Sequence, residues 1–354
     1  MRERIFQLFV RLGQSAGRPI DVLGLGECSQ DRVLRLPGRL TTLAPLFSDP
    51  QSGGKLSANS LDRVGGGQVA TALCAASRLG YRCAFAGVVG DDSDGREVLA
   101  GLQAEGIDTT ATTVLPQIPT RSALILVDER GDRVVLEHRH PSLRPQPDQP
   151  SAALLGRTRI VHVDATFPAA AQRALRQGRA AGAMTSLDLD RDTPDAVALL
   201  PEADLAIVAA NIPPRLTGLA EIETAACALA RTLPGLLIVT LGEAGSLLAL
   251  PDGAAVICHR QAAFPAVAGA GLPDTTACGD TYRAALLCAL LDAAPSSPDK
   301  AWLALREAMR SGSAAAALKC RDLGRRGCPR RDELAAFLAQ PPLDAAALGD
   351  CRDR

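Results

Sequence analysis

Short apolar segments alternate with helix-like segments along most of this 354-residue chain, and that alternation constrains the fold more than any other feature of the sequence. The apolar runs expected to form strands lie at 20–26, 83–89, 160–163, 185–189, 205–209, 236–241 and 246–250. Segments with helical periodicity lie at 68–79, 95–104, 169–181 and 219–232. Strands flanked by helices predict a mostly parallel sheet that is covered on both faces. The sequence therefore predicts a doubly wound α/β fold.

A predicted β-hairpin at 122–137, with its turn at 129–132, interrupts this alternation. Such an interruption is typical of a lid or small subdomain, and an ordinary edge hairpin is an equally common cause. A proline-rich stretch at 141–150 then separates the first series of elements from the second.

The two ends of the chain are expected to lie outside the main domain, which we place at 19–340. Residues 1–18 form an N-terminal extension, in which the short apolar run at 5–10 is interrupted by Gln7 and followed by Arg11. This pattern indicates a frayed helix rather than a signal peptide. Residues 341–354 are expected to be a C-terminal tail.

The composition limits the kinds of molecule that the protein is expected to bind. Lys and Arg total 38 against 39 Asp and Glu, so the net charge of -1 provides no field that would attract nucleic acid or an anionic membrane. An anionic ligand must therefore be held by a local arrangement of residues and not by the overall charge of the protein. The ten cysteines are scattered without a CxxC pair, which favours reduced thiols. Since no stretch approaches about 18 apolar residues, we expect a cytoplasmic protein with no membrane partner.

The segment 274–280 carries the strongest chemical signal. Asp274, Thr275 and Thr276 form a polar turn, after which Ala277-Cys278-Gly279-Asp280 leads into a helix at 281–291 that is apolar nearly all round. Unpaired N–H groups and the positive dipole end at such a helix start stabilise an anion. Asp280 in the first turn can accept a proton from a nearby hydroxyl. The alternative is structural: Asp274 as an N-cap, Asp280 at a favourable helix end, and small residues for packing.

This segment resembles the signature of the ribokinase-like, or PfkB, family of carbohydrate kinases, which runs Asp-Thr-Thr-Gly-Ala-Gly-Asp and ends in the catalytic base. The likeness extends over most of the chain, through Gly24-Leu25-Gly26-Glu27 with Asp31, Gly66-Gly67, Arg78-Leu79-Gly80, Val89-Gly90-Asp91-Asp92, the region 120–139, Val239-Thr240-Leu241-Gly242-Glu243-Ala244-Gly245 and Ala317-Leu318-Lys319-Cys320. The resemblance implies a ribokinase-like fold with a small β lid, formed by strands from about 31–60 and 118–140. Lids of this family often pair between subunits, which suggests a homodimer.

The resemblance assigns the acceptor side of the site. Asp31 matches the carboxylate that grips sugar hydroxyls, and Gly66 and Gly67 match the pair whose backbone lies against the substrate. Thr71 replaces the usual Asn of the family. Arg139, at the end of the predicted hairpin, could reach a phosphate or an acidic group, although a solvated Arg is the commoner outcome. His138 and His140 lack a third ligand candidate, so we favour a non-metal interpretation.

The nucleotide side is assigned in the same way. Thr240, Gly242 and Gly245 match the loop along the ATP phosphates, and the helix region 313–320, with Lys319, matches the adenine side. Asn211 matches an Asn-x-x-Glu element that orders magnesium through water. Its Glu position is Pro214 here, so Mg²⁺ is expected to be held by ATP phosphates and water. The resemblance also points to K⁺ near Asp274 and Thr276.

Two residues of the signature depart from the family pattern. Ala277 replaces the first Gly, and a positive φ there would cost about 1 kcal/mol. Cys278 replaces Ala, and a thiol at a helix N-terminus can have a lowered pKa, although a plain small residue is the favoured interpretation.

The predicted activity is transfer of the ATP γ-phosphoryl group to a hydroxyl of a sugar or sugar-like alcohol. Asp280 would act as base, and the N–H groups of Ala277, Cys278 and Gly279 would stabilise the moving charge. One alternative is a nucleoside or phosphosugar kinase of the same fold, with Arg63 and Arg139 as the basic residues. Another is a degenerate kinase that binds nucleotide or sugar as a regulator.

Overall fold

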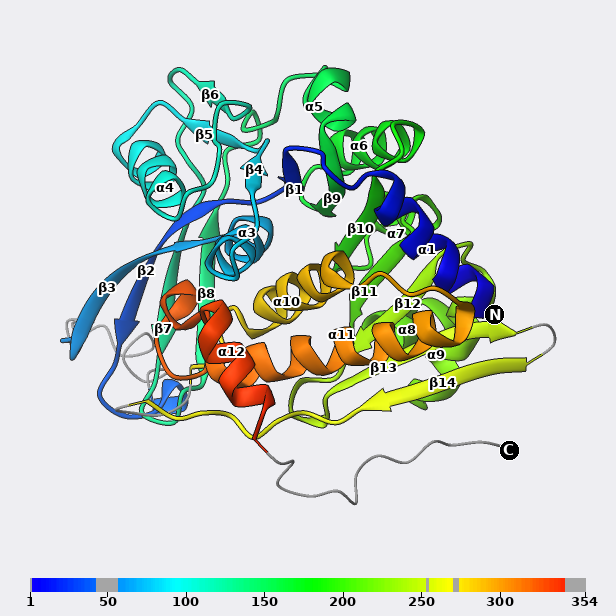
Figure 1. The fold of residues 1–354 in the computed structure, drawn as a ribbon. Helices are drawn as coiled ribbons and strands as arrows, with labels where there is room; N and C mark the ends of the chain where they lie inside the picture. Colours follow the sequence, from blue (N-terminus) through cyan, green and yellow to red (C-terminus); the bar gives the residue numbers. More distant parts are fainter. Residues whose placement is uncertain (1, 43–56, 253–254, 270–273, 341–354) are drawn as a thin grey trace.

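The computed structural model describes residues 2–42, 57–252, 255–269 and 274–340, and its centre is a large twisted sheet (Figure 1). Within the described residues this sheet has eight strands in the order β14-β13-β12-β11-β10-β9-β1-β4. The strands are β1 Ile20–Leu25, β4 Cys83–Phe85, β9 Thr158–Asp164, β10 Met184–Leu189, β11 Leu205–Ala209, β12 Leu236–Thr240, β13 Ser246–Asp252 and β14 Ala255–Gln261. Only the β12–β13 and β13–β14 pairings are antiparallel. The predicted mostly parallel sheet is confirmed.

Helices cover both faces of this sheet, because neighbouring residues along each buried strand point to opposite faces. One face packs against α1 Arg2–Gln14, α3 Gln68–Arg78, α10 Cys278–Asp292 and α11 Pro298–Lys319. The other packs against α5 Ala152–Gly156, α6 Pro168–Ala180, α7 Pro194–Val197 and α9 Ile222–Arg231. In β1, for example, Val22 belongs to the first core and Leu23 to the second. The remaining helices are α4 Ser93–Ala104, α8 Ile212–Thr217 and α12 Arg331–Leu338.

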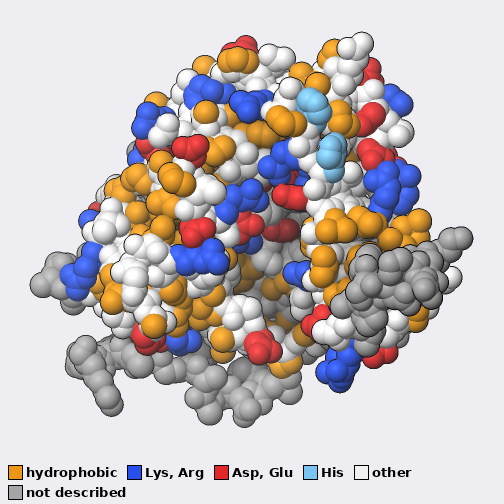
Figure 2. Space-filling view, turned by 180° about the vertical axis from the view of Figure 1, so that it is seen from behind, with side chains coloured by type: hydrophobic (Ala, Val, Ile, Leu, Met, Phe, Trp, Pro, Cys, Tyr) orange, Lys and Arg blue, Asp and Glu red, His pale blue; other side chains and the backbone are white. Residues whose placement is uncertain are grey.

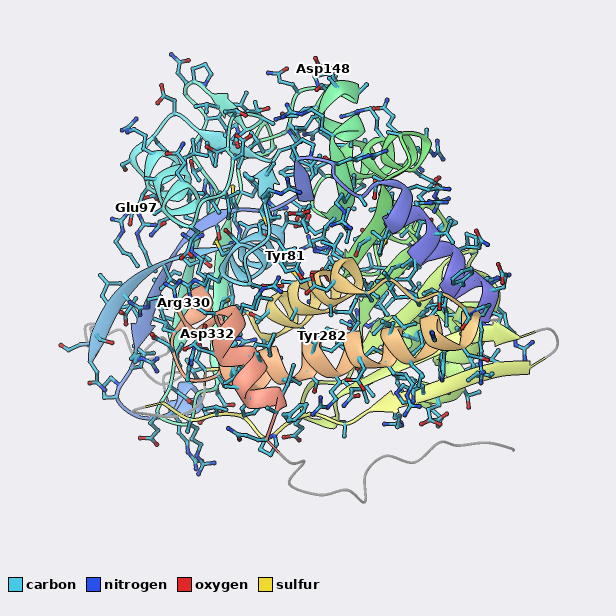
Figure 3. The ribbon with its side chains drawn as sticks, viewed as in Figure 1. Tyr81, Glu97, Asp148, Tyr282, Arg330 and Asp332 are labelled. Atoms are coloured by element: carbon cyan, nitrogen blue, oxygen red, sulfur yellow. The ribbon has the colours of Figure 1, made fainter. Side chains whose placement is uncertain are left out.

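Two hydrogen bonds of buried tyrosines lock α10 in place. Tyr81, after α3, donates to the Cys288 carbonyl over 2.9 Å, and Tyr282 donates to Ser246 Oγ on β13 over 2.8 Å (Figure 3). A buried tyrosine needs a partner for its hydroxyl, and these partners fix the helix against α3 and the sheet. The start of α10 is therefore held at a defined place over the sheet.

The N-terminal helix is part of the core. Ile5, Leu8, Phe9 and Leu12 of α1 are buried, at the i, i+3, i+4 and i+7 spacing of one apolar face, and α1 packs against α11. Arg11 also pairs with Asp204 over 2.8 Å. The expectation of a frayed helix is wrong, because its apolar face finds a partner that is distant in sequence.

A second sheet stands beside the main one, with its strands in the order β3-β2-β7-β8 (Figure 1). Its strands are β2 Ser29–Arg35, β3 Ser60–Gly66, β7 Ser122–Val127 and β8 Arg133–His138. The predicted hairpin is confirmed as β7 and β8. We call this sheet the lid sheet. Part of the predicted lid, 43–56, and the predicted tail, 341–354, lie outside the described residues.

Some element boundaries differ from the sequence prediction. The expected strand at 83–89 divides into β4 and β5 Val88–Gly90, and β5 pairs with β6 Thr113–Leu115 in a separate two-stranded sheet. Gly87 lies between the two strands, where a Cβ would approach the Phe85 ring to 2.1 Å. The alanine-rich stretch at 313–318 is the last part of the 22-residue helix α11.

Candidate active site

The carboxyl ends of the parallel strands bring candidate residues to one edge of the sheet, as expected for an open α/β fold. Glu27 follows β1, Asp164 ends β9, Asp190 follows β10, Asn211 follows β11 and Thr240 ends β12. The molecular face in Figure 2 is hollowed near its centre, and acidic and basic side chains gather around the hollow.

The segment 274–280 forms the start of α10, and Ala277 has a left-handed backbone with φ 68°. This conformation turns the chain into the helix. The Cys278 N–H donates to the Thr275 carbonyl over 3.3 Å, and the Gly279 N–H belongs to the first turn, whose donors lack partners within the helix. Ala277 Cβ is strained there by about 1 kcal/mol relative to glycine. The helix start has the geometry that an anion-binding site requires.

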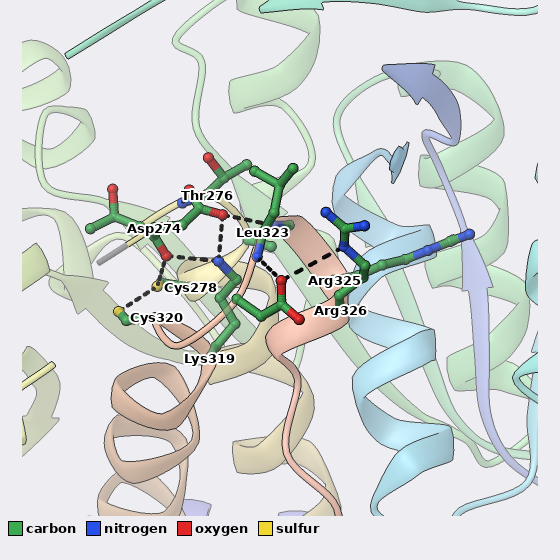
Figure 4. Close-up of polar contacts among 12 residues, drawn as sticks. Asp274, Thr276, Cys278, Lys319, Cys320, Leu323, Arg325 and Arg326 are labelled. Carbon is green, nitrogen blue, oxygen red and sulfur yellow. Dashed lines mark hydrogen bonds and ion pairs between the residues drawn. The ribbon is translucent and has the colours of Figure 1, made fainter. Parts of the chain in front are cut away.

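Asp274 is held by donors from three directions (Figure 4). Its Oδ2 accepts from Lys319 Nζ over 2.9 Å and from the Gly324 N–H over 2.7 Å, while Oδ1 accepts from the Thr276 N–H over 3.0 Å. Burial alone would raise the pKa of Asp274, but the hydrogen bonds and the Lys319 charge lower it. The carboxylate is therefore ionised and fixes the turn before α10.

These contacts do not fit a K⁺ ion at Asp274 and Thr276. The ammonium of Lys319 already compensates the Asp274 charge, and the Thr276 hydroxyl accepts from Arg133 of β8 over 3.3 Å. No group of three potential metal ligands is present in 2–42, 57–252, 255–269 or 274–340.

Asp280 lies in the first turn of α10 with the properties of a general base. Burial, opposed by the charge of Arg283 and assisted by the carboxylates of Asp164 and Asp190, raises the pKa of Asp280 to about 7. A base is most effective when its pKa lies near the working pH. The side chain keeps 16% of its surface exposed, so a substrate hydroxyl can reach it.

A buried ion pair that sequence reasoning missed supports Asp280. The Arg283 guanidinium lies 2.6 Å from Asp188 and 3.7 Å from Asp280. Burial raises the pKa of Asp188 well above its usual value, and the Arg283 charge acts in the opposite direction. Arg283 lies in a helix whose other residues are mostly apolar, and a lone Arg in such a helix was the available signal.

The residues predicted to bind the acceptor gather around a second buried arginine, Arg121. Its guanidinium reaches Asp31 over 3.2 Å, Glu27 over 3.4 Å and Glu137 over 2.9 Å. Asp31 is 8% exposed, and burial raises its pKa against the effect of Arg121. Arg139 joins the same network through Glu27. The structure thus brings Asp31 and Arg139 together, and it adds Arg121 and Glu27, which lacked an assigned role in the sequence.

The predicted glycine pair fits tightly against this network. A Cβ on Gly66 would lie 2.1 Å from Asp31 Oδ2, and Gly67 has φ 93° with Glu27 O only 2.4 Å from a Cβ. Both positions therefore require glycine. Thr71, one turn into α3, is 2% exposed and its N–H bonds Gly67 O over 2.9 Å.

Asp164 is a further acidic residue that the sequence analysis did not single out. Its Oδ2 accepts from the Glu27 N–H over 2.7 Å and its Oδ1 from the Thr166 N–H over 2.8 Å. Its pKa is raised to about 6 by burial and by Glu27. A cavity of about 800 Å³ is lined by Arg139 and Thr166, among other residues.

The residues predicted to bind the nucleotide lie at the ends of β11 and β12. Gly242 and Gly245 have φ 61° and 91°, and a Cβ on Gly245 would lie 2.0 Å from Gln261 O. The Thr240 hydroxyl donates to Val208 O over 3.3 Å, and Asn211 precedes α8 without a side-chain cap. Lys319 is fully buried and donates to Asp274, so its ammonium positions the signature segment in this structure.

The Cys278 thiol lies 3.4 Å from Cys320. A hydrogen bond between the two lowers the pKa of Cys320 to about 7, while the same bond and burial raise that of Cys278. The lesser alternative of a lowered pKa at Cys278 is therefore contradicted, whereas a plain small residue, the favoured interpretation, is not.

The fold and site together define an α/β phosphotransferase with a β lid. Residues 43–331 match the pfkB family carbohydrate kinase domain, and the chain belongs to this family. It is 28% identical over 281 residues to a probable fructokinase-4 of Arabidopsis thaliana, covering 72% of this chain and 80% of that protein. It is 26% identical over 329 residues to an ATP-dependent ribose-1-phosphate kinase of Halopiger xanaduensis, covering 91% and 99%.

A solved structure gives the same fold. A putative ribokinase from Agrobacterium tumefaciens superposes with a TM-score of 0.77 and 28% identity, covering 91% of this chain and 99% of that one. The predicted ribokinase-like architecture is confirmed. Among the described helices, none is long and apolar enough to cross a membrane.

Proposed function

We propose that this protein transfers the γ-phosphoryl group of ATP to a hydroxyl of a sugar or sugar-like alcohol. The observation that carries the proposal is Asp280, a carboxylate whose pKa is raised to about 7, in the first turn of a helix whose N-terminal end favours a bound anion. A proton acceptor and an anion-binding site are thereby joined in one segment. Membership of the pfkB carbohydrate kinases supports the same chemistry.

Each part of the site has a role in this reaction. Asp280 takes the proton as the acceptor oxygen attacks, and the N–H groups of Ala277, Cys278 and Gly279 hold the transferring phosphoryl group. The loop at Thr240, Gly242 and Gly245, with Asn211, binds the nucleotide phosphates. Mg²⁺, when bound to the nucleotide, supplies charge neutralisation.

The acceptor lies between the lid sheet and the main sheet. Asp31 and Asp164 present carboxylate oxygens that can accept hydrogen bonds from sugar hydroxyls, and the backbone at Gly66 and Gly67 allows close approach. Arg121 keeps Asp31 compensated. Relatives named fructokinase and ribokinase support a ketose or pentose acceptor.

A coupled ADP-release assay over a sugar panel tests this assignment. The panel should include fructose, ribose and short oligosaccharides, because the cavity of about 800 Å³ lined by Arg139 lies in the upper part of the usual range of ligand pockets, about 300–1,000 Å³. Asp280→Asn should lower kcat at least 100-fold while ATP still raises the melting temperature. The matched control is Asp332→Asn, an exposed carboxylate on α12 (Figure 3).

Near-normal turnover of Asp280→Asn would contradict the assignment of Asp280 as the general base. Nucleotide and sugar binding without ADP release, in the unaltered protein, would identify a regulator instead of a kinase.

We also propose a homodimer formed through the lid sheet, in a cytoplasmic protein. The exposed face and edge of β8 carry Val134, Val135 and Leu136, exposed by 43%, 47% and 55%. Exposed apolar strands are typical pairing surfaces. Val135→Lys should convert the dimer to a monomer in sedimentation experiments. A wild-type protein that sediments as a monomer would contradict the proposal. The free thiols of the nine described cysteines support a reducing compartment.

A further inference from the structure

Two cysteines meet inside the phosphate-binding segment (Figure 4). Cys278 is the first residue of α10, and Cys320 directly follows α11. Their sulfur atoms are 3.4 Å apart, and both thiols also lie near the Ala316 carbonyl, at 3.5 and 3.4 Å. Both side chains therefore point to the same place.

The surroundings tie this pair to the nucleotide side. Lys319, next to Cys320, donates to the carbonyl of Asp274 over 2.7 Å as well as to its carboxylate. Asp274 N–H in turn donates to Cys320 O over 3.0 Å. The chain at 274–278 is thus attached to the end of α11 by several short contacts, and a change at either sulfur reaches the other segment.

We propose that Cys278 and Cys320 form a redox modification site, in which a two-electron oxidant converts the thiol pair to a disulfide across the phosphate-binding segment. An oxidant of the hydroperoxide or azodicarboxamide class accepts the electrons and protons that this reaction releases. Two S–H bonds break and one S–S bond forms. The two electrons and two protons pass to the oxidant, so that diamide, for example, becomes its hydrazine.

The geometry explains why closure would stop phosphoryl transfer. A disulfide needs its sulfurs about 2.05 Å apart, so the present 3.4 Å must shrink by more than 1 Å. Closing this gap shifts the first turn of α10 relative to the end of α11, and the N–H groups proposed to hold the phosphoryl group lie in that turn. A misplacement of about 1 Å in an active site can cost about 100-fold in rate. This consequence rests on the proposed function, whereas formation of the disulfide does not.

A second thiol pair gives an internal control. Cys227 on α9 and Cys258 on β14 have sulfurs 2.6 Å apart. Cys258 packs against the second core, on the opposite face of the sheet from α10, and α9, which carries Cys227, covers that same face. Oxidation of that pair should leave the phosphate-binding segment in place.

The experiment treats the full chain with diamide and maps disulfide-linked peptides by mass spectrometry. The Cys227→Ser/Cys258→Ser variant should still form the 278–320 link, lose at least 10-fold in turnover and recover with dithiothreitol. Cys320→Ser in the same background should form no link, and its turnover after diamide should equal its own untreated value. The melting-temperature rise given by a non-hydrolysable ATP analogue provides a readout that needs no turnover.

Two outcomes would overturn the inference. One is absence of the 278–320 peptide under conditions that link 227 to 258. The other is a quantitative 278–320 link with unchanged turnover and an unchanged response to the ATP analogue. Lack of kinase activity in the untreated protein would instead count against the proposed function, because the linked peptide and the analogue response are measured independently of it.

Discussion

The Arg283 guanidinium lies 2.6 Å from the Asp188 carboxylate, and the same side chain approaches Asp280 at 3.7 Å. One buried cation therefore compensates a buried carboxylate and faces the candidate base. Without Arg283, both acids would favour their neutral forms more strongly. Arg283 is thus a positioning residue that keeps Asp280 ionisable near neutral pH.

The first prediction concerns pH. Because the pKa of Asp280 is raised to about 7, its basic form is depleted below that pH. We expect kcat/KM to fall about tenfold per pH unit well below 7 and to level off above it. A pH–rate profile with the best acceptor of the panel measures this limb. A flat profile from pH 5 to 8 would contradict the assignment.

The second prediction concerns Arg283→Leu. Loss of the guanidinium leaves Asp188 buried without compensation, which should cost about 3–5 kcal/mol in the free energy of unfolding. The acid limb of kcat/KM should also move to higher pH, since Arg283 lowers the pKa of Asp280. Urea denaturation and the pH profile measure the two effects.

Its control is the double variant Arg283→Leu/Asp188→Leu, in which both buried charges are removed. Stability should return in part, because a buried pair replaced by apolar side chains is often tolerated. If the double variant is instead less stable than Arg283→Leu, the loss of the second charge adds to the loss of the first. The two residues would then not act as a pair.

The third prediction concerns Ala277→Gly. Ala277 has φ 68°, where a Cβ is strained, so glycine should raise the free energy of unfolding by about 1 kcal/mol. Turnover should be equal or higher, because the helix start keeps its conformation. Ala289→Gly, in the interior of α10, is the matched control and should instead lower stability by about 1 kcal/mol. Equal effects at both positions would exclude strain at Ala277.

The fourth prediction concerns Lys319→Met. The fully buried ammonium compensates Asp274, whose pKa is lowered despite its burial. A lowered pKa means that ionised Asp274 stabilises the fold above its unfolded value near 3.8, and that this contribution is lost as pH falls through the folded value. The variant should lose several kcal/mol of stability at pH 7 and should bind ATP more weakly.

Thermal unfolding from pH 3 to 7 checks the fourth prediction. The difference between wild type and Lys319→Met should shrink toward low pH, where Asp274 becomes neutral in both. A constant difference would point to lost packing of the lysine stem alone.

Local sequence patterns predicted the parallel sheet, the helix after Asp280 and the hairpin of β7 and β8, because strand and helix periodicity depend on neighbouring residues. They also identified Ala277 as a position where a positive φ would matter. The sequence patterns did not predict the ion pairs of Arg121 and Arg283 or the Cys278–Cys320 pair, since each joins segments that are far apart in the chain. Side-chain partners of that kind become visible only when the topology is known.

The packing of α1 on α11 sets an order for folding during synthesis. Residues 2–14 leave the ribosome long before residues 298–319, and at about 5–20 residues per second the delay is about 15–60 seconds. Throughout that interval Ile5, Leu8, Phe9 and Leu12 lack their final partner. A nascent chain of this protein therefore exposes the apolar face of α1 until α11 has been synthesised, and such a face is a binding site for a chaperone at the ribosome exit.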